Sequence, residues 1–126
     1  MRVNSTPAPF HQVDMLSYIK DEHPCVPTTL RVMDEFCSRK LEEIADLIPS
    51  LDKDESLECH LDDMDTLARI KDLAWAFIGG QLDPHYFENI YVPKWVLVEL
   101  LQYMCKNHTS EGYDICFVIE LIRQCK

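Results

Sequence analysis

The clearest periodic pattern of apolar and polar residues runs from residue 28 to residue 48. Its apolar positions lie three or four residues apart, and they are Leu30, Met33, Cys37, Leu41, Ile44 and Ile48. This spacing places them on one face of a helix, with polar residues on the other face. Thr28 or Thr29 is a suitable N-cap, and Pro49 ends the pattern. We therefore predict an amphipathic helix of about 20 residues here.

A second apolar stripe predicts a helix from residue 62 to residue 78. The stripe consists of Met64, Leu67, Ile70, Ala74 and Phe77. Aspartates in the first turn of this helix would face the positive end of its dipole, and Gly79-Gly80 is a suitable left-handed C-cap. Residues 50–61 are acidic and only weakly periodic. They are compatible with a loop, a short helix or the beginning of the next helix.

Shorter helical patterns occur on both sides of these two helices. Before the two long helices, we expect a short helix over 15–20 capped by Asp14, and after them one helical turn over 84–89. Two further helices follow, one from Pro93 to 105 and a last one that is capped by Ser110 and runs through 115–122. The last two are apolar on most sides, which predicts a buried hairpin with Leu101, Phe117 and Ile119 in its core. Residues 115–119 could also form a buried strand, but the chain offers no partner strands for it.

These patterns predict an all-α fold, a single compact bundle of five to six helices with a buried C-terminal helical hairpin. Residues 1–12 contain two prolines, no periodicity and little charge, so we expect a flexible N-terminal arm there. Residues 13–126 would then form a single helical domain, which agrees with the length of 126 residues.

Acidic residues outnumber basic ones, and they are concentrated in one segment. The chain has a formal net charge of −10. Between Glu42 and Asp65, ten acidic residues are accompanied by a single basic residue, Lys53. Nucleic acids and anionic membranes attract basic surfaces. We therefore expect neither as a partner, and a basic protein segment suits the charge better.

The six cysteines indicate the compartment. The first residues contain no apolar stretch typical of a signal peptide, and no apolar run approaches the roughly 20 residues that span a bilayer. Cys37, Cys105 and Cys116 follow helical apolar spacing, where a free thiol packs as a small hydrophobic group. We predict reduced cysteines in an intracellular protein, cytoplasmic or nuclear and not secreted.

No pattern of residues selects a catalytic or metal site. The chain holds three short Cys/His pairs, namely His23 with Cys25, Cys59 with His60, and Cys105 with His108. The first and last pairs lie 80 positions apart, whereas zinc fingers place two pairs within about 12–20 residues. We therefore predict no metal, no cofactor and no enzymatic activity, and a Cys/His (zinc) enzyme stays an alternative.

An acidic face is the first candidate binding surface. If the second long helix extends through 54–68, Glu55, Glu58 and Asp62 share one face, whereas Leu57, Leu61, Met64 and Ala68 occupy another. We take Glu55, Glu58, Asp62 and Asp65 as candidate partner-binding residues. The alternatives are a solvated face that keeps the protein soluble, a docking surface for a basic protein, and a mimic of the DNA backbone.

An aromatic connection is the second candidate binding surface. Between Pro84 and Trp95 lie four large aromatic residues, Tyr86, Phe87, Tyr91 and Trp95. Such residues are frequent at interface hot spots. They either close the end of the bundle or contact a partner. We expect the tyrosines to contact a partner, because their hydroxyl groups tolerate exposure, and Trp95 to close the bundle.

A short stretch resembles the central helix of Bcl-2-like proteins. Arg69-Ile70 and Phe77-Ile78-Gly79-Gly80-Gln81-Leu82 are similar to the family's Asn-Trp-Gly-Arg-Ile followed by Phe-Gly-Gly. Thr66-Leu67-Ala68 stands here instead of Asn-Trp-Gly, the gap is longer, and the resemblance covers residues 69–82. It implies a compact helical regulator of apoptosis or innate signalling.

Taken together, the sequence predicts a non-enzymatic protein–protein interaction module, an adaptor or inhibitor. The partner would be a helix or a basic peptide, bound through the aromatic connection and the acidic face. A Bcl-2-like regulator, an acidic DNA mimic and a Cys/His enzyme are the alternatives, and the oligomeric state stays open.

Overall fold

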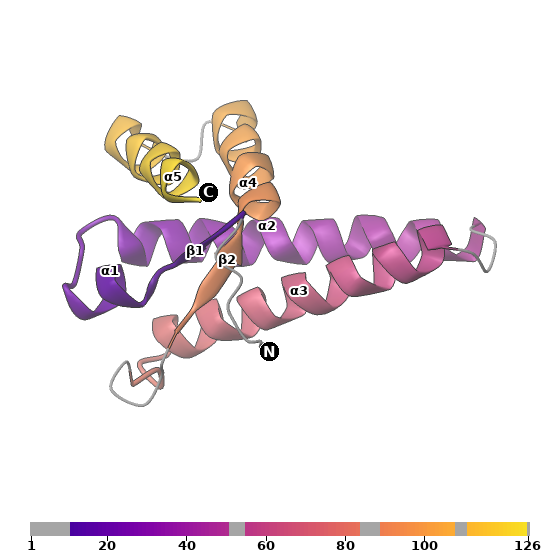
Figure 1. Ribbon diagram of the computed structural model, residues 1–126, viewed down its shortest axis with the longest axis horizontal. Coiled ribbons are helices and arrows are strands. Elements are labelled where there is room, and N and C mark those ends of the chain that lie inside the picture. Colours follow the sequence, from indigo (N-terminus) through magenta and orange to yellow (C-terminus); the bar gives the residue numbers. More distant parts are fainter. Residues whose placement is uncertain (1–10, 51–54, 84–88, 108–110, 126) are drawn as a thin grey trace, which may run out of the picture. The chain divides into compact units, whose positions relative to one another are not determined.

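The computed structural model describes residues 11–50, 55–83, 89–107 and 111–125 (Figure 1). Its elements are β1 (Gln12–Asp14), α1 (Leu16–Lys20), α2 (Val26–Leu47) with the 3₁₀ turn η1 (Ile48–Ser50), α3 (Glu55–Ile78), β2 (Tyr91–Pro93), α4 (Lys94–Asn107) and α5 (Gly112–Gln124). The predicted helical class is therefore confirmed, with five α-helices in the described part of the chain. A small two-stranded sheet was not predicted.

Two compact units can be distinguished along the chain. One comprises residues 30–82, which form most of α2 and the whole of α3. The other combines residues up to 29 with residues from 83 onward, and holds the sheet, α1, α4 and α5. The predicted arm over 1–12 falls almost wholly outside the described residues, although Gln12 already belongs to β1. The single domain over 13–126 stays a prediction.

Helix α2 begins at Val26, two residues before the expected N-cap at Thr28 or Thr29. Pro27 is tolerated there because the N–H groups of a first helical turn have no partner within the helix. The Val26 N–H donates to the His23 carbonyl at 3.0 Å. The predicted stripe faces inward, since Leu30, Met33, Cys37 and Ile44 are buried and Leu41 and Ile48 are half-buried.

Helix α3 is continuous over 24 residues and begins at Glu55, seven residues before the predicted start. Of the three alternatives for residues 50–61, the beginning of the next helix applies from Glu55 onward. The predicted C-cap is confirmed. Gly80 has a φ of +72°, its N–H donates to the Phe77 carbonyl at 3.1 Å, and the Gln81 N–H donates to the Ala76 carbonyl at 2.8 Å. This is the Schellman arrangement, which favours glycine because its left-handed backbone is strained for other residues.

Helices α2 and α3 form an antiparallel hairpin (Figure 1). From α3, Leu67, Ile70 and Ala74 are buried, and Met64 and Phe77 at the two ends of the predicted stripe are half-buried. A polar contact also joins the two helices, because Lys71 Nζ lies 3.6 Å from Asp34 Oδ1.

The sheet pairs β1 with β2 in antiparallel orientation, with Val13 opposite Val92. Both valines are buried. Asp14 Oδ1 accepts hydrogen bonds from the N–H groups of Leu16, at 3.0 Å, and Ile90, at 2.8 Å. The N-cap of α1 is Met15 and not the predicted Asp14. The Asp14 carboxylate nevertheless connects the first turn of α1 to the residue before β2. Each strand has only three residues, too few for an alternating pattern to be visible in the sequence.

Helices α4 and α5 pack against each other, as the predicted C-terminal hairpin requires. Each helix buries one face: Val96, Leu97, Leu100 and Met104 from α4, and Asp114, Phe117, Val118 and Leu121 from α5. Phe117 is buried as predicted, but Leu101 and Ile119 are only half-buried, and that part of the prediction is wrong. Successive side chains of a helix point in directions that differ by about 100°, so neighbouring apolar residues cannot all face one partner. Glu111 is the N-cap of α5, and the predicted cap Ser110 lies outside the described residues. The expected helical turn over 84–89 also lies outside them, except for Asn89.

Candidate functional site

The predicted acidic face exists on α3 as a row of exposed carboxylates. Glu58, Asp62 and Asp65 are exposed, and Asp72 extends the row by two further turns. Glu55 is the first residue of α3, but its side chain lies outside the described part. Asp65 also contacts Arg69 of the next turn at 3.4 Å, with both side chains largely in solvent. We call these four described residues, Glu58, Asp62, Asp65 and Asp72, the acidic row.

Beside the acidic row, α3 carries a second apolar surface, which adjoins the buried face of the helix at Met64. Leu61, Trp75 and Ile78 have exposed fractions of 48%, 59% and 45%, and Met64 and Ala68 between them are half-buried. Sequence reasoning separated Leu61, Met64 and Ala68 from the acidic residues but did not assign Trp75 and Ile78 to this exposed surface. We call these five residues, Leu61, Met64, Ala68, Trp75 and Ile78, the α3 stripe.

The Trp75 ring is held in place by a neighbour from the previous turn. Lys71 Nζ lies 5.3 Å from the centre of the ring, within the range of a cation–π contact. The same ammonium group contacts Asp34 Oδ1 on α2 at 3.6 Å. The lysine therefore links α2 to the exposed indole, which reduces the freedom of that side chain before any partner arrives.

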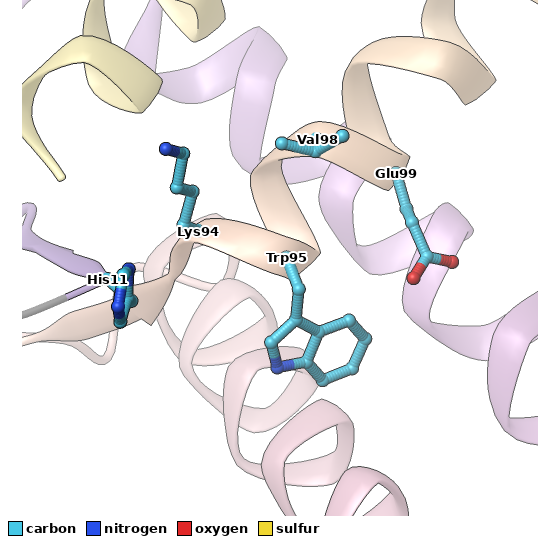
Figure 2. Close-up of a pocket in the computed structure, with 5 residues that line it drawn as sticks. All are labelled: His11, Lys94, Trp95, Val98 and Glu99. Carbon is cyan, nitrogen blue, oxygen red and sulfur yellow. The ribbon is translucent and has the colours of Figure 1, made fainter. Parts of the chain in front are cut away.

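The aromatic connection is only partly described. Tyr86 and Phe87 lie outside the described residues, Tyr91 is 37% exposed on β2, and Trp95 is half-buried in the first turn of α4. Trp95 lines a cavity of about 500 Å³ together with His11, Lys94, Val98 and Glu99 (Figure 2). The Lys94 N–H donates to the His11 carbonyl at 2.6 Å, which joins the beginning of α4 to the residue before β1. Tyr91 does not line this cavity, so the two described aromatic residues belong to different surfaces.

An aromatic cluster that sequence reasoning missed lies in the unit that holds α5. Tyr18 contacts Phe117 edge-on with ring centres 5.4 Å apart, and His23 stacks on Phe117 at 4.4 Å. His23 Nδ1 accepts a hydrogen bond from the Cys25 N–H at 3.1 Å. Burial, followed by the charge of Glu120 and a hydrogen bond to it, raises the pKa of the Tyr18 hydroxyl. These contacts order the loop before α2, which no local sequence pattern indicates.

The thiol beside this cluster has the wrong properties for a nucleophile. Cys25 is buried and its Sγ donates to the Tyr113 carbonyl at 3.8 Å. Burial, followed by the effect of the neighbouring Asp114 carboxylate, raises the pKa of the thiol. A nucleophilic cysteine needs a lowered pKa, because the thiolate is the reactive form. The proximity of Cys25, His23 and Asp114 therefore favours packing over covalent catalysis.

All six cysteines are free thiols, as predicted. Cys37 is buried, but Cys105 and Cys116 are exposed, so their predicted burial is wrong. Both lie on the outward side of a helix that buries only one face. Within the described segments, no group of three or more His, Cys, Asp or Glu residues could hold a metal ion, and no helix is long and apolar enough to cross a bilayer. His108 lies outside these segments.

Comparison with protein-family models, with curated protein sequences and with solved structures finds no match to this chain. The resemblance of residues 69–82 to Bcl-2-like proteins therefore stays a prediction. In the structure, this stretch contains the end of α3 and its glycine C-cap.

Proposed function

We propose that this protein is a non-enzymatic interaction module that binds a basic segment of another protein through the outward side of α3. The observation that supports the proposal is the adjacency, on one helix, of the acidic row and the α3 stripe. Carboxylates attract a basic partner and orient its approach, whereas desolvated apolar contacts supply most of the binding free energy. A face that only solvates the protein needs no exposed Trp75, Leu61 or Ile78.

The same observation favours a partner segment that is both basic and apolar over the DNA-binding surface that a DNA mimic would occupy. A surface that imitates the DNA backbone offers its target anionic groups, and the α3 stripe would have no counterpart in such a complex. The six free thiols support a reducing compartment, cytoplasmic or nuclear.

The test compares two variants that lose equal charge. The first neutralises three residues of the acidic row (Glu58→Gln, Asp62→Asn, Asp65→Asn), and the control neutralises three exposed residues of α2 (Glu42→Gln, Glu43→Gln, Asp46→Asn). The probe is a fluorescent lysine-rich peptide, and its dissociation constant is measured by anisotropy at low and at physiological salt.

We expect the α3 variant to bind the probe about tenfold more weakly, because three attractive contacts of about half a kcal/mol each are lost. The α2 control should stay within about twofold of the wild type. Equal weakening by both variants would mean that the probe responds to net charge alone, and the acidic row would then be only a solvated face. Unchanged binding in the α3 variant would also contradict the proposal.

A further inference from the structure

We infer that the partner segment is an amphipathic α-helix of about 18 residues that lies lengthwise on the α3 stripe, with lysine or arginine residues along one flank only. The inference rests on the proposed function and specifies the chemistry of its partner. Its basis is the length of the stripe, the placement of charge beside it, and the exposure of Trp75.

The length of the stripe determines the form of the partner. Leu61 and Ile78 are 17 positions apart on one unbroken helix, which corresponds to a distance of about 26 Å at 1.5 Å per residue. The row turns slowly around the axis of α3, and a partner helix that crosses at a small angle can follow it with contacts at i, i+3 or i+4, and i+7. A tight turn or a short loop would reach only one or two of these side chains.

The charge beside the stripe is on one side. With about 100° per residue, Asp65 and Asp72 lie roughly 60–80° from Trp75 around the helix axis, in one direction. In the other direction lie Lys71 and then the buried Leu67. The partner therefore meets carboxylates along one flank of its apolar face, and basic residues are favoured along that flank alone.

The same charges disfavour a second copy of this chain as the occupant. Two copies that met along the α3 stripe would bring two acidic rows together, and three of the four residues of each row belong to the segment 42–65, in which ten acidic residues accompany one basic residue. Like charges placed opposite each other oppose association. A basic helix neutralises the row, so we commit to that occupant.

Trp75 is the expected centre of the contact. It is the most exposed apolar residue of the stripe, and Lys71 already limits the positions of its ring. Large aromatic side chains that become fully desolvated are the usual hot spots of interfaces. Truncation of Trp75 should therefore weaken binding by about 30-fold or more, the ratio that corresponds to a hot-spot residue.

The experiment uses the full chain and two 18-residue peptides of identical composition. The first peptide places leucines on one helical face and lysines along one flank, and the second has the same residues shuffled so that neither type forms a row. Dissociation constants come from fluorescence anisotropy, and the helix content of each complex from circular dichroism. The protein variants are Trp75→Ala and Leu61→Asn on the stripe, and the triple variant that neutralises the acidic row. Tyr113→Ala is the control, because Tyr113 is a 66% exposed aromatic residue on α5.

We expect the amphipathic peptide to bind at least about tenfold more tightly than the shuffled one and to become helical in the complex. Trp75→Ala should remove this preference, Leu61→Asn should reduce it, and Tyr113→Ala should leave it unchanged. If both peptides bind equally and both need the acidic row, the proposed function stands and the helical partner is wrong. If neither peptide needs the acidic row, the proposed function itself fails. If the amphipathic peptide binds tightly but its dissociation constant is unchanged by both stripe variants, the docking site lies elsewhere and the inference is overturned.

Discussion

The thiol of Cys37 should make the stability of the protein depend on alkaline pH. Cys37 is fully buried on α2, and burial, with a smaller effect of the neighbouring Asp34 charge, raises the pKa of the thiol to about 12 from the ordinary value of 9.0. The folded protein therefore keeps this thiol neutral at a pH where the unfolded chain already ionises it. The contribution to stability is fully present below pH 9 and is lost as the pH rises from 9 toward 12.

The magnitude follows from the difference between the two pKa values. Above pH 9, each further pH unit stabilises the unfolded chain by about 1.4 kcal/mol through this one group. Between pH 8 and pH 10, the free energy of unfolding should thus fall by about 1.4 kcal/mol more in the wild type than in a Cys37→Ala variant. The cavity left by the variant shifts its stability by a constant amount at every pH, and lysines, tyrosines and the other cysteines titrate in both proteins.

The assay is urea denaturation of both proteins at pH 8, 9 and 10, followed by far-ultraviolet circular dichroism under reducing conditions. The quantity of interest is the difference in unfolding free energy between the two proteins, plotted against pH. A difference that stays constant from pH 8 to pH 10 would refute the reasoning. It would mean that Cys37 ionises equally easily in the folded and unfolded chains, and hence that this face of α2 is not buried.

Three further predictions concern packing, backbone and thiol exposure. Leu100→Ala should destabilise the protein by about 2–5 kcal/mol and Leu101→Ala by less than half as much, because only Leu100 is fully buried. Equal losses of stability in thermal melts of the two variants would contradict the α4 packing. Gly80→Ala should cost about 1 kcal/mol because of its left-handed backbone, whereas Gly112→Ala, which meets open space, should stay within about 0.5 kcal/mol of the wild type in urea denaturation. A thiol reagent should modify three cysteines of the native protein quickly and the other three only after denaturation, as mass spectrometry of the labelled peptides would show; fast labelling of a buried thiol would contradict the fold. The three exposed thiols are Cys59, Cys105 and Cys116.

Periodicity identified the helices because it is a local property. The three- and four-residue spacing from Leu30 to Ile48 needed no knowledge of the partner helix, and the same holds for Gly79-Gly80 as a C-cap. The acidic row was also predictable, since Glu58, Asp62 and Asp65 share a face whenever the chain around them is helical. The start of α3 was left open among three alternatives, because residues 55–61 carry too little apolar periodicity to distinguish a helix from a loop.

The sequence by itself thus determined the helical class, most element boundaries to within a few residues, and the acidic face of α3. Only the tertiary structure decided which side of each apolar helix is buried, and so why Leu100 is enclosed while Leu101, Cys105 and Cys116 are not. It also decided the pairing of Val13 with Val92 and the hydrogen bond from the Cys25 thiol to the Tyr113 carbonyl, which join residues far apart in the chain. The exposure of Trp75 was likewise decided by tertiary structure, because it depends on what the described parts of the chain place against that side of α3. Local spacing determines which residues share a face, whereas burial depends on what the rest of the chain places against that face.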